Sequence, residues 1–128
     1  MKILMLTVVL LSASLLGGQA IADVSLQNKQ DIEGSWKVDY TKNSLTDRRP
    51  AKREDTWVFT DGNFTIKHIP RAGTYYDQLP APYEIENGKL KTLVLGSPKF
   101  DLYTVVEKSD KAMTLKNKYG TYYFFTKE

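Results

Sequence analysis

Polar and apolar residues alternate along most of the chain beyond residue 22, in short segments rich in Val, Ile, Thr, Tyr and Phe. Gly, Pro, Asn and Asp separate these segments, and no long stretch repeats its apolar residues every 3.6 positions. A period of two residues is typical of β-strands that bury one face. The pattern predicts an all-β protein with eight or nine strands, at residues 35–40, 56–60, 64–68, 74–77, 83–86, 90–95, 100–107, 112–117 and 121–126.

Two dipeptides, Asp61-Gly62 and Asn87-Gly88, mark tight hairpins between consecutive strands. Type I′ turns need positive φ at both central residues, which Asp, Asn and Gly tolerate. Successive hairpins make an antiparallel up-and-down meander. Such a meander must close into a barrel or fold over on itself, because its edge strands would otherwise stay unpaired. We expect a small closed barrel in which Trp36 is buried near one end, against the last strand around residues 122–125.

The same alternation assigns one face of each strand to the barrel interior. Polar residues at the intervening positions, such as Lys37, Thr65 and Glu84, are assigned to the wet face. Residues 100–106 and 122–125 are apolar on both faces, so alternation does not orient them. The side chains predicted to point inwards are those of Trp36, Val38, Tyr40, Trp57, Phe59, Phe64, Ile66, His68, Tyr83, Ile85, Met113 and Leu115.

The first 22 residues have the pattern of a secretory signal peptide. Met1-Lys2 is a short basic start, residues 3–16 are largely apolar, and Ala20-Ile21-Ala22 supplies small residues for cleavage. The run is shorter than the roughly 20 residues of a spanning helix, and an uncleaved N-terminal anchor is the alternative. We therefore expect an exported protein, periplasmic or secreted, with a lead-in at 23–33, a barrel domain at 34–128 and no membrane span after cleavage.

Charge and residue usage exclude several functional classes. Eighteen Lys and Arg against 15 Asp and Glu give a formal net charge of +3, too small for a strong field that gathers nucleic acid. The absence of Cys excludes a disulfide framework, and with His68 as the single histidine it argues against zinc and iron–sulfur sites. No glycine-rich phosphate loop is present. We expect no cofactor, no metal and no nucleic-acid partner.

Catalytic patterns are also weak. His68 is the single candidate for a catalytic histidine, but no Ser and carboxylate stand in a recognisable arrangement with it, so a hydrogen-bonded or rim histidine is the simpler interpretation. Glu84 and Glu86 share one strand face, yet a catalytic carboxylate pair needs an apolar pocket that raises one pKa. We therefore interpret both as residues of a solvent-exposed strand face. The sequence therefore favours a protein that is not an enzyme and has no catalytic residues.

A family resemblance adds to this interpretation. Gly34-Ser35-Trp36, at the start of the first strand, resembles the Gly-x-Trp signature that opens the lipocalin barrel. The order and spacing of later motifs are similar to those of small exported lipocalin-like domains of bacteria, over about residues 32–127. The resemblance implies a barrel with a ligand at its open end. These later motifs are residues 57–64, 83–90, 103–105 and 113–115.

Two functions are compatible with these patterns. The first is a binding protein for a small apolar or amphipathic molecule, whose acidic head group would be met by the basic segment 41–54, which we expect to be a long loop or short helix. The second is a filled barrel whose loops or outer surface bind another protein of the cell envelope, as an inhibitor, immunity or assembly factor. The candidate ligand-binding residues are Trp57, Phe59, Phe64, Ile66, His68, Tyr83, Arg48 and Arg49.

Overall fold

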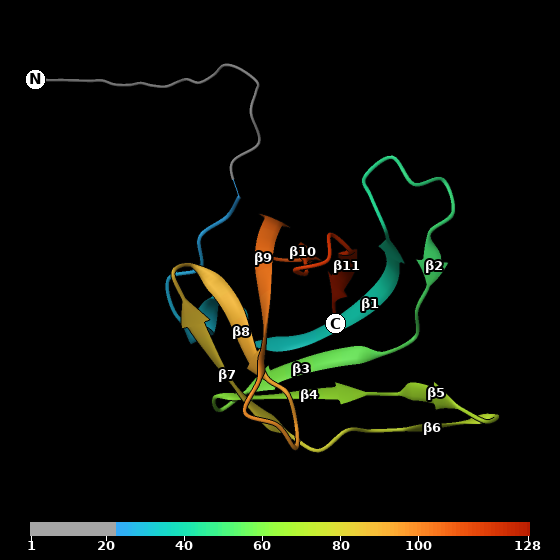
Figure 1. Cartoon of the computed structure of the whole chain (residues 1–128), viewed down its shortest axis with the longest axis horizontal. Coiled ribbons are helices and arrows are strands. Elements are labelled where there is room, and N and C mark those ends of the chain that lie inside the picture. Colours follow the sequence, from blue (N-terminus) through green and yellow to red (C-terminus); the bar gives the residue numbers. More distant parts are fainter. Residues whose placement is uncertain (1–22) are drawn as a thin grey trace, which may run out of the picture.

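The computed structural model describes residues 23–128 and shows an all-β protein (Figure 1). The predicted signal peptide, residues 1–22, lies outside the described residues. No helix within residues 23–128 is long and apolar enough to cross a membrane. The elements are the 3-10 helix η2 (Lys29–Asp31) and the strands β1 (Gly34–Lys42), β2 (Ala51–Lys52), β3 (Thr56–Thr60), β4 (Asn63–Lys67), β5 (Ile69–Arg71), β6 (Thr74–Tyr76), β7 (Ala81–Glu86), β8 (Lys89–Leu93), β9 (Phe100–Lys108), β10 (Ala112–Lys116) and β11 (Tyr122–Lys127).

Eight of these strands close into an antiparallel barrel, as the alternation predicted. Neighbouring strands follow the order β11-β10-β9-β8-β7-β4-β3-β1, and β1 also pairs with β11, which closes the ring. In this closing ladder Trp36 lies opposite Lys127 and Val38 lies opposite Phe125. The first and last barrel strands are therefore neighbours, and no edge of the barrel remains open along this seam.

Three strands lie outside the barrel. The two-residue β2 pairs with the C-terminal part of β1, at Tyr40 and Thr41. The basic segment is therefore a loop that returns to the barrel rather than a short helix. The predicted strand at 74–77 is present as β6, but it pairs only with β5, in a hairpin that projects from the barrel (Figure 1). The turn of this hairpin is Ala72-Gly73, with φ of 46° and 82°.

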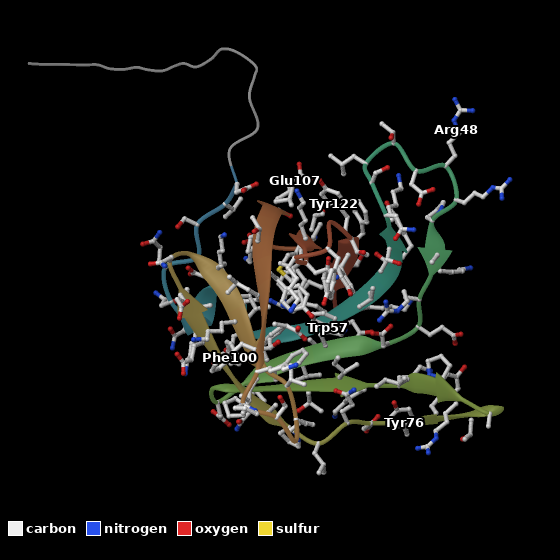
Figure 2. All side chains as sticks on the ribbon, in the orientation of Figure 1. Arg48, Trp57, Tyr76, Phe100, Glu107 and Tyr122 are labelled. Atoms are coloured by element: carbon white, nitrogen blue, oxygen red, sulfur yellow. The ribbon has the colours of Figure 1, made fainter. Side chains whose placement is uncertain are left out.

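The interior is filled by aromatic and aliphatic side chains. Trp57 lies at the centre (Figure 2), and its ring centroid is 5.0–5.5 Å from those of four other aromatic residues, namely Phe64, Tyr103, Tyr123 and Phe125. Eight-stranded barrels have room for side chains or for one small ligand, and here side chains occupy the centre. Alternation did not assign an inward face to residues 100–106 and 122–125. The structure does, because Tyr103, Val105 and Phe125 belong to the buried core.

A bulge in β1 corrects one predicted face. The β1–β11 register passes from Val38 opposite Phe125 to Tyr40 opposite Phe124, so Asp39 is an extra residue. An extra residue reverses the inward and outward positions beyond it. Thr41 is consequently buried, whereas Tyr40 is turned away from the core and stacks on Phe124, with ring centroids 4.6 Å apart.

His68 departs from its predicted inward position for a related reason. Its backbone takes the left-handed conformation, with φ of 61°, at the junction between β4 and β5. The side chain is exposed and stacks on Tyr75, with a centroid distance of 3.6 Å, and the backbone N–H of His68 donates to Asp77 Oδ1. His68 therefore belongs to the base of the projecting hairpin and not to the barrel interior.

One end of the barrel is covered by the lead-in and η2. Ile32 is fully buried, and the indole Nε1–H of Trp36 donates to the Ile32 carbonyl at 2.9 Å. Leu26 is also buried, and its N–H donates to the carbonyl of Gly88 in the turn between β7 and β8. The predicted lead-in is therefore part of the core rather than a loose extension.

The contact of the lead-in with Gly88 makes a testable prediction. Gly88 has φ of 80°, and a Cβ at this position would collide with the side chain of Ser25. We expect Gly88→Ala to lower the free energy of unfolding by about 1–3 kcal/mol, from backbone strain together with displacement of the lead-in. Chemical denaturation measures the loss. The matched control is Gly73→Ala, which has a similar φ of 82° and no neighbouring atom within 4 Å; equal losses in both variants would contradict a role for the Ser25 contact.

Candidate ligand site at the open end of the barrel

The end of the barrel opposite η2 carries four connections. Hairpin-joined antiparallel strands bring every second connection to one end, so the β1–β3, β4–β7, β8–β9 and β10–β11 connections lie together. The first contains β2 and the basic loop, and the second contains the β5–β6 hairpin. Loops carried on a rigid barrel are common places for binding sites.

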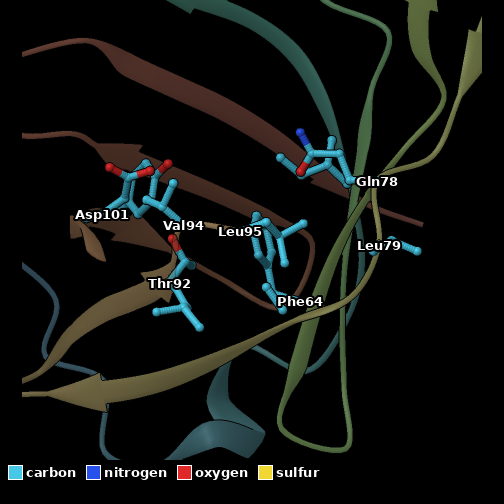
Figure 3. A pocket seen from close by; sticks show the side chains of 11 residues that line it. Phe64, Gln78, Leu79, Thr92, Val94, Leu95 and Asp101 are labelled. Carbon is cyan, nitrogen blue, oxygen red and sulfur yellow. The ribbon is translucent and has the colours of Figure 1, made fainter. Parts of the chain in front are cut away.

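A pocket of about 260 Å³ opens at this end, between the β4–β7 connection and the β8–β9 connection (Figure 3). The β4–β7 ladder contains only two residue pairs, Asn63 with Pro82 and Phe64 with Ala81. Beyond them the regular ladder ends, although the Gln78 N–H still donates to the Ile66 carbonyl at 2.8 Å, and the pocket lies beside this irregular stretch. The lining side chains are mostly apolar, with a few polar groups among them, and belong to Phe64, Ile66, Gln78, Leu79, Ala81, Thr92, Leu93, Val94, Leu95, Asp101 and Tyr103.

Two polar residues of the lining are cross-strand neighbours. Thr92 of β8 lies opposite Asp101 of β9 in the ladder. Residues two apart on a strand point to the same face of the sheet. Thr92 and Asp101 therefore point inwards, because Leu90 and Tyr103, two residues away on the same strands, are buried in the core. Figure 3 shows Thr92 and Asp101 on one side of the pocket and Gln78 and Leu79 across from them. The pocket thus combines apolar walls with polar groups at defined positions.

A buried ion pair stands beside the aromatic centre at the same end. Asp55 is buried and accepts hydrogen bonds from Arg53 Nε at 2.8 Å, from Arg53 Nη2 at 2.7 Å and from Trp57 Nε1 at 3.0 Å. The Arg53 guanidinium carbon lies 5.6 Å from the Tyr123 ring centroid. Burial by itself lowers the pKa of Arg53, but Asp55 and the nearby Tyr123 outweigh it and raise that pKa. The guanidinium is therefore firmly charged and bound to Asp55.

Tyr103 links this ion pair to the pocket. Its ring lies 5.5 Å from that of Trp57 and 5.9 Å from that of Tyr123, and it lines the pocket beside Asp101. Burial is the main cause that raises the pKa of its hydroxyl, with the negative charge that Tyr123 and Asp101 can carry as further causes. Tyr103 is therefore a neutral hydrogen-bonding group at neutral pH.

The structure distributes the sequence-predicted ligand residues over four places. Phe64 and Ile66 line the pocket, while Trp57, Phe59 and Tyr83 are almost fully buried in the core behind it. The other three do not line it: His68 lies at the base of the hairpin, and Arg48 lies with Arg49 on the loop before β2, where Figure 2 shows Arg48 pointing away from the barrel. The pocket residues that alternation did not indicate are Gln78, Leu79, Ala81, Thr92, Leu93, Val94, Leu95, Asp101 and Tyr103.

A visible signal existed for some of these missed residues. Leu90, Thr92 and Val94 share one parity in the predicted strand 90–95, so an inward Thr92 and Val94 follow from an inward Leu90. Asp101 lies at the start of a strand with apolar residues on both faces, and no periodicity orients it. Among residues 23–128, no group of three His, Cys, Asp or Glu side chains could hold a metal ion.

The closed ring of strands and the pocket at its open end define a small antiparallel eight-stranded β-barrel. The chain matches no family model and no curated protein. It is similar to a crystal structure of an uncharacterized protein from Bacteroides eggerthii DSM 20697, with a TM-score of 0.62 and 18% sequence identity, over 77% of this chain and 100% of that chain. At this identity the likeness shows a shared fold alone.

Proposed function

We propose that this protein is an exported, non-enzymatic binding protein of the lipocalin-like type, which takes a small amphipathic molecule into the pocket at the open end of its barrel. The observation that carries the proposal is the pocket itself. Apolar walls surround two inward-facing polar residues, Thr92 and Asp101, at the end that η2 does not cover. Ligand sites are commonly concave and mostly apolar, with a few placed polar groups.

The packing around Trp36 supports the lipocalin-like part of the proposal. Lys127 Nζ lies 4.7 Å from the Trp36 ring centroid, a position that resembles that of the arginine packing over the opening tryptophan in lipocalins. Gly34, with φ of 120°, makes room for this lysine, because a Cβ there would lie 2.5 Å from Lys127 Cε. The Gly-x-Trp spacing thus has a local physical reason in this chain.

The size of the pocket limits the ligand. A volume of about 260 Å³ is below the roughly 300–1,000 Å³ of sites for drug-sized molecules. The aromatic cluster around Trp57 fills the barrel beneath it, so a long acyl chain has no deep cavity to enter. We therefore propose a compact ligand, of the size of one ring with a short polar chain, in place of a fatty acid.

Export and the absence of catalysis complete the proposal. The basic start, apolar run and Ala20-Ile21-Ala22 of the leader support passage out of the cytoplasm. Within residues 23–128, no side-chain hydrogen bond joins the pocket residues Thr92, Asp101 and Tyr103 into the partnered nucleophile and base that hydrolytic chemistry needs. Binding without chemical conversion is the simplest activity of such a site.

A second candidate function is supported by a different observation. The filled interior and the projecting β5–β6 hairpin, with Tyr75 and Tyr76 exposed, would suit a barrel that binds an envelope protein through its loops. Tyrosine is favoured at protein interfaces because it combines an apolar ring with a polar tip. This alternative is preferred if no small amphiphile binds the pocket.

Titration with 4-phenyl-1-butanol tests the proposed function. Trp57 contacts Phe64 and Tyr103, both in the pocket wall, so tryptophan emission and amide NMR shifts of the wall should change on saturation. We expect Leu95→Asp, in the pocket lip, to weaken binding at least tenfold. Leu45→Asp is the matched control, because Leu45 is similarly exposed at 54% against 45% and does not line this pocket. Unchanged spectra with the alcohol and with its amine and carboxylate analogues would refute the pocket.

A further inference from the structure

Asp101 is an inward-facing carboxylate at the mouth of the barrel. It lies on the same face of β9 as the buried residues Tyr103 and Val105, and its cross-strand neighbour Thr92 is buried. Its side chain therefore belongs to the pocket and not to the outer surface of the sheet. A carboxylate placed next to apolar walls gives up part of its hydration, which favours a partner that restores the lost interactions.

Within residues 23–128 no Lys, Arg or His nitrogen lies within 4.0 Å of the Asp101 carboxylate. Lys99, two residues before Asp101 in the sequence, forms no ion pair with it, and two other basic residues, Lys91 and Arg53, are engaged elsewhere. Lys91 donates to Glu86 at 2.8 Å and lies 4.0 Å from the Phe100 ring centroid, and Arg53 is bound to Asp55. The negative charge of Asp101 is thus left without a cation from the described part of the chain.

The other lining residues fit the same ligand chemistry. None of the eleven is Lys, Arg or His, so an anionic ligand would meet Asp101 without any compensating positive charge. Thr92 and Tyr103 offer hydroxyl oxygens, and Gln78 offers an amide oxygen, all able to accept a hydrogen bond. The rings of Phe64 and Tyr103 also present the aromatic faces that attract cations.

We propose that the pocket selects a cationic amphiphile, a compact molecule whose protonated amine binds the Asp101 carboxylate and whose apolar body packs among Phe64, Ile66 and Leu95. This assignment rests on the proposed function and adds the charge of the ligand. It replaces the acidic head group that the basic loop suggested, because Arg48 and Arg49 do not line this pocket. The charge-assisted hydrogen bond between ammonium and carboxylate supplies the selectivity.

Three compounds with one skeleton test the charge: 4-phenylbutylamine, 4-phenyl-1-butanol and 4-phenylbutyrate, each titrated at pH 7 and low salt with NMR and fluorescence detection. We expect the amine to bind at least tenfold more tightly than the alcohol and the carboxylate to bind most weakly, from the strength of hydrogen bonds to charged groups. Asp101→Asn keeps the side-chain shape. It should weaken binding of the amine about tenfold or more and change the affinity for the alcohol by no more than about threefold.

The matched control is Asp110→Asn, which removes an exposed carboxylate in the β9–β10 turn at the covered end of the barrel. We expect this variant to bind the amine with unchanged affinity. Three results would overturn the proposed charge selectivity and leave the pocket as a binding site: equal affinity for the amine and the alcohol, tighter binding of the carboxylate, or an unchanged affinity of Asp101→Asn for the amine. Absence of binding by all three compounds would overturn the proposed function and this assignment together.

Discussion

Trp36→Ala should lower the free energy of unfolding by about 3–5 kcal/mol, the range for truncating a buried aromatic side chain. Trp36 has no exposed surface, and it lies where β1 meets both β3 and β11. Its indole N–H is bonded to the Ile32 carbonyl, and Lys127 covers its ring. Truncation would open a cavity at the closing seam and leave the lead-in without its anchor. Urea denaturation followed by circular dichroism measures the loss.

Two further variants keep this test decisive. Tyr119→Ala removes an aromatic residue that is 80% exposed and should change stability by less than about 0.5 kcal/mol. Trp36→Phe keeps much of the packing and should be only partly destabilised, which gives a measurable value if Trp36→Ala does not fold. A loss below about 1 kcal/mol for Trp36→Ala would show that the seam does not depend on this side chain.

The second large effect is expected at Asp55. Asp55→Ala should cost about 2–4 kcal/mol, because it leaves the Arg53 guanidinium and the Trp57 indole N–H without their acceptor. This loss of stability is smaller than the full cost of breaking a buried ion pair, because the Arg53 side chain is 35% exposed and water can reach it. Differential scanning calorimetry or urea denaturation measures the change.

A double-mutant cycle separates the ion pair from the packing around it. Arg53→Ala, Asp55→Ala and the double variant give the coupling free energy, which should be favourable by roughly 1 kcal/mol or more for a partly buried, bidentate pair. Asp47→Ala is the comparison within the same loop: Asp47 accepts backbone N–H groups of Asn43 and Arg49 but is only partly buried. A loss at Asp47 as large as that at Asp55 would contradict a special role for the buried carboxylate.

The fold was predictable because most strands bury a single face. Trp36, Trp57, Phe59, Met113 and Leu115 follow a strict period of two, and all five are buried in the core. The Asp-Gly and Asn-Gly turns then fixed where one strand ends and the next begins. These signals are local, so they survive without knowledge of the partner strands.

The exceptions arise from geometry that alternation does not contain. The extra residue Asp39 reverses the faces of β1 and places Tyr40 outside. The left-handed backbone at His68 ends β4 and begins a hairpin outside the barrel. Neither a bulge nor a positive φ at a non-glycine residue changes the apolar pattern of the sequence, so both become visible only when strands are paired.

The candidate site was predictable only in part. Phe64 and Ile66 were indicated because alternation assigned both side chains to the barrel interior, and both line the pocket. Asp101 was not, since its strand is apolar on both faces and a carboxylate beside such a run is ordinarily assigned to solvent. The filling of the interior around Trp57 also depends on how side chains from four strands meet, which a one-dimensional pattern does not describe.

The pairing of the first barrel strand with the last has a consequence for how the chain acquires its structure. Asp39 and Thr126 are hydrogen-bonded although they lie 87 residues apart in sequence. Pairings between such distant segments carry a large loop-closure entropy and slow folding. The ring cannot close until β11 has left the ribosome, and until then β1 and β10 each lack one of their two neighbouring barrel strands. A nascent chain that lacks β11 is therefore expected to expose two unpaired strand edges.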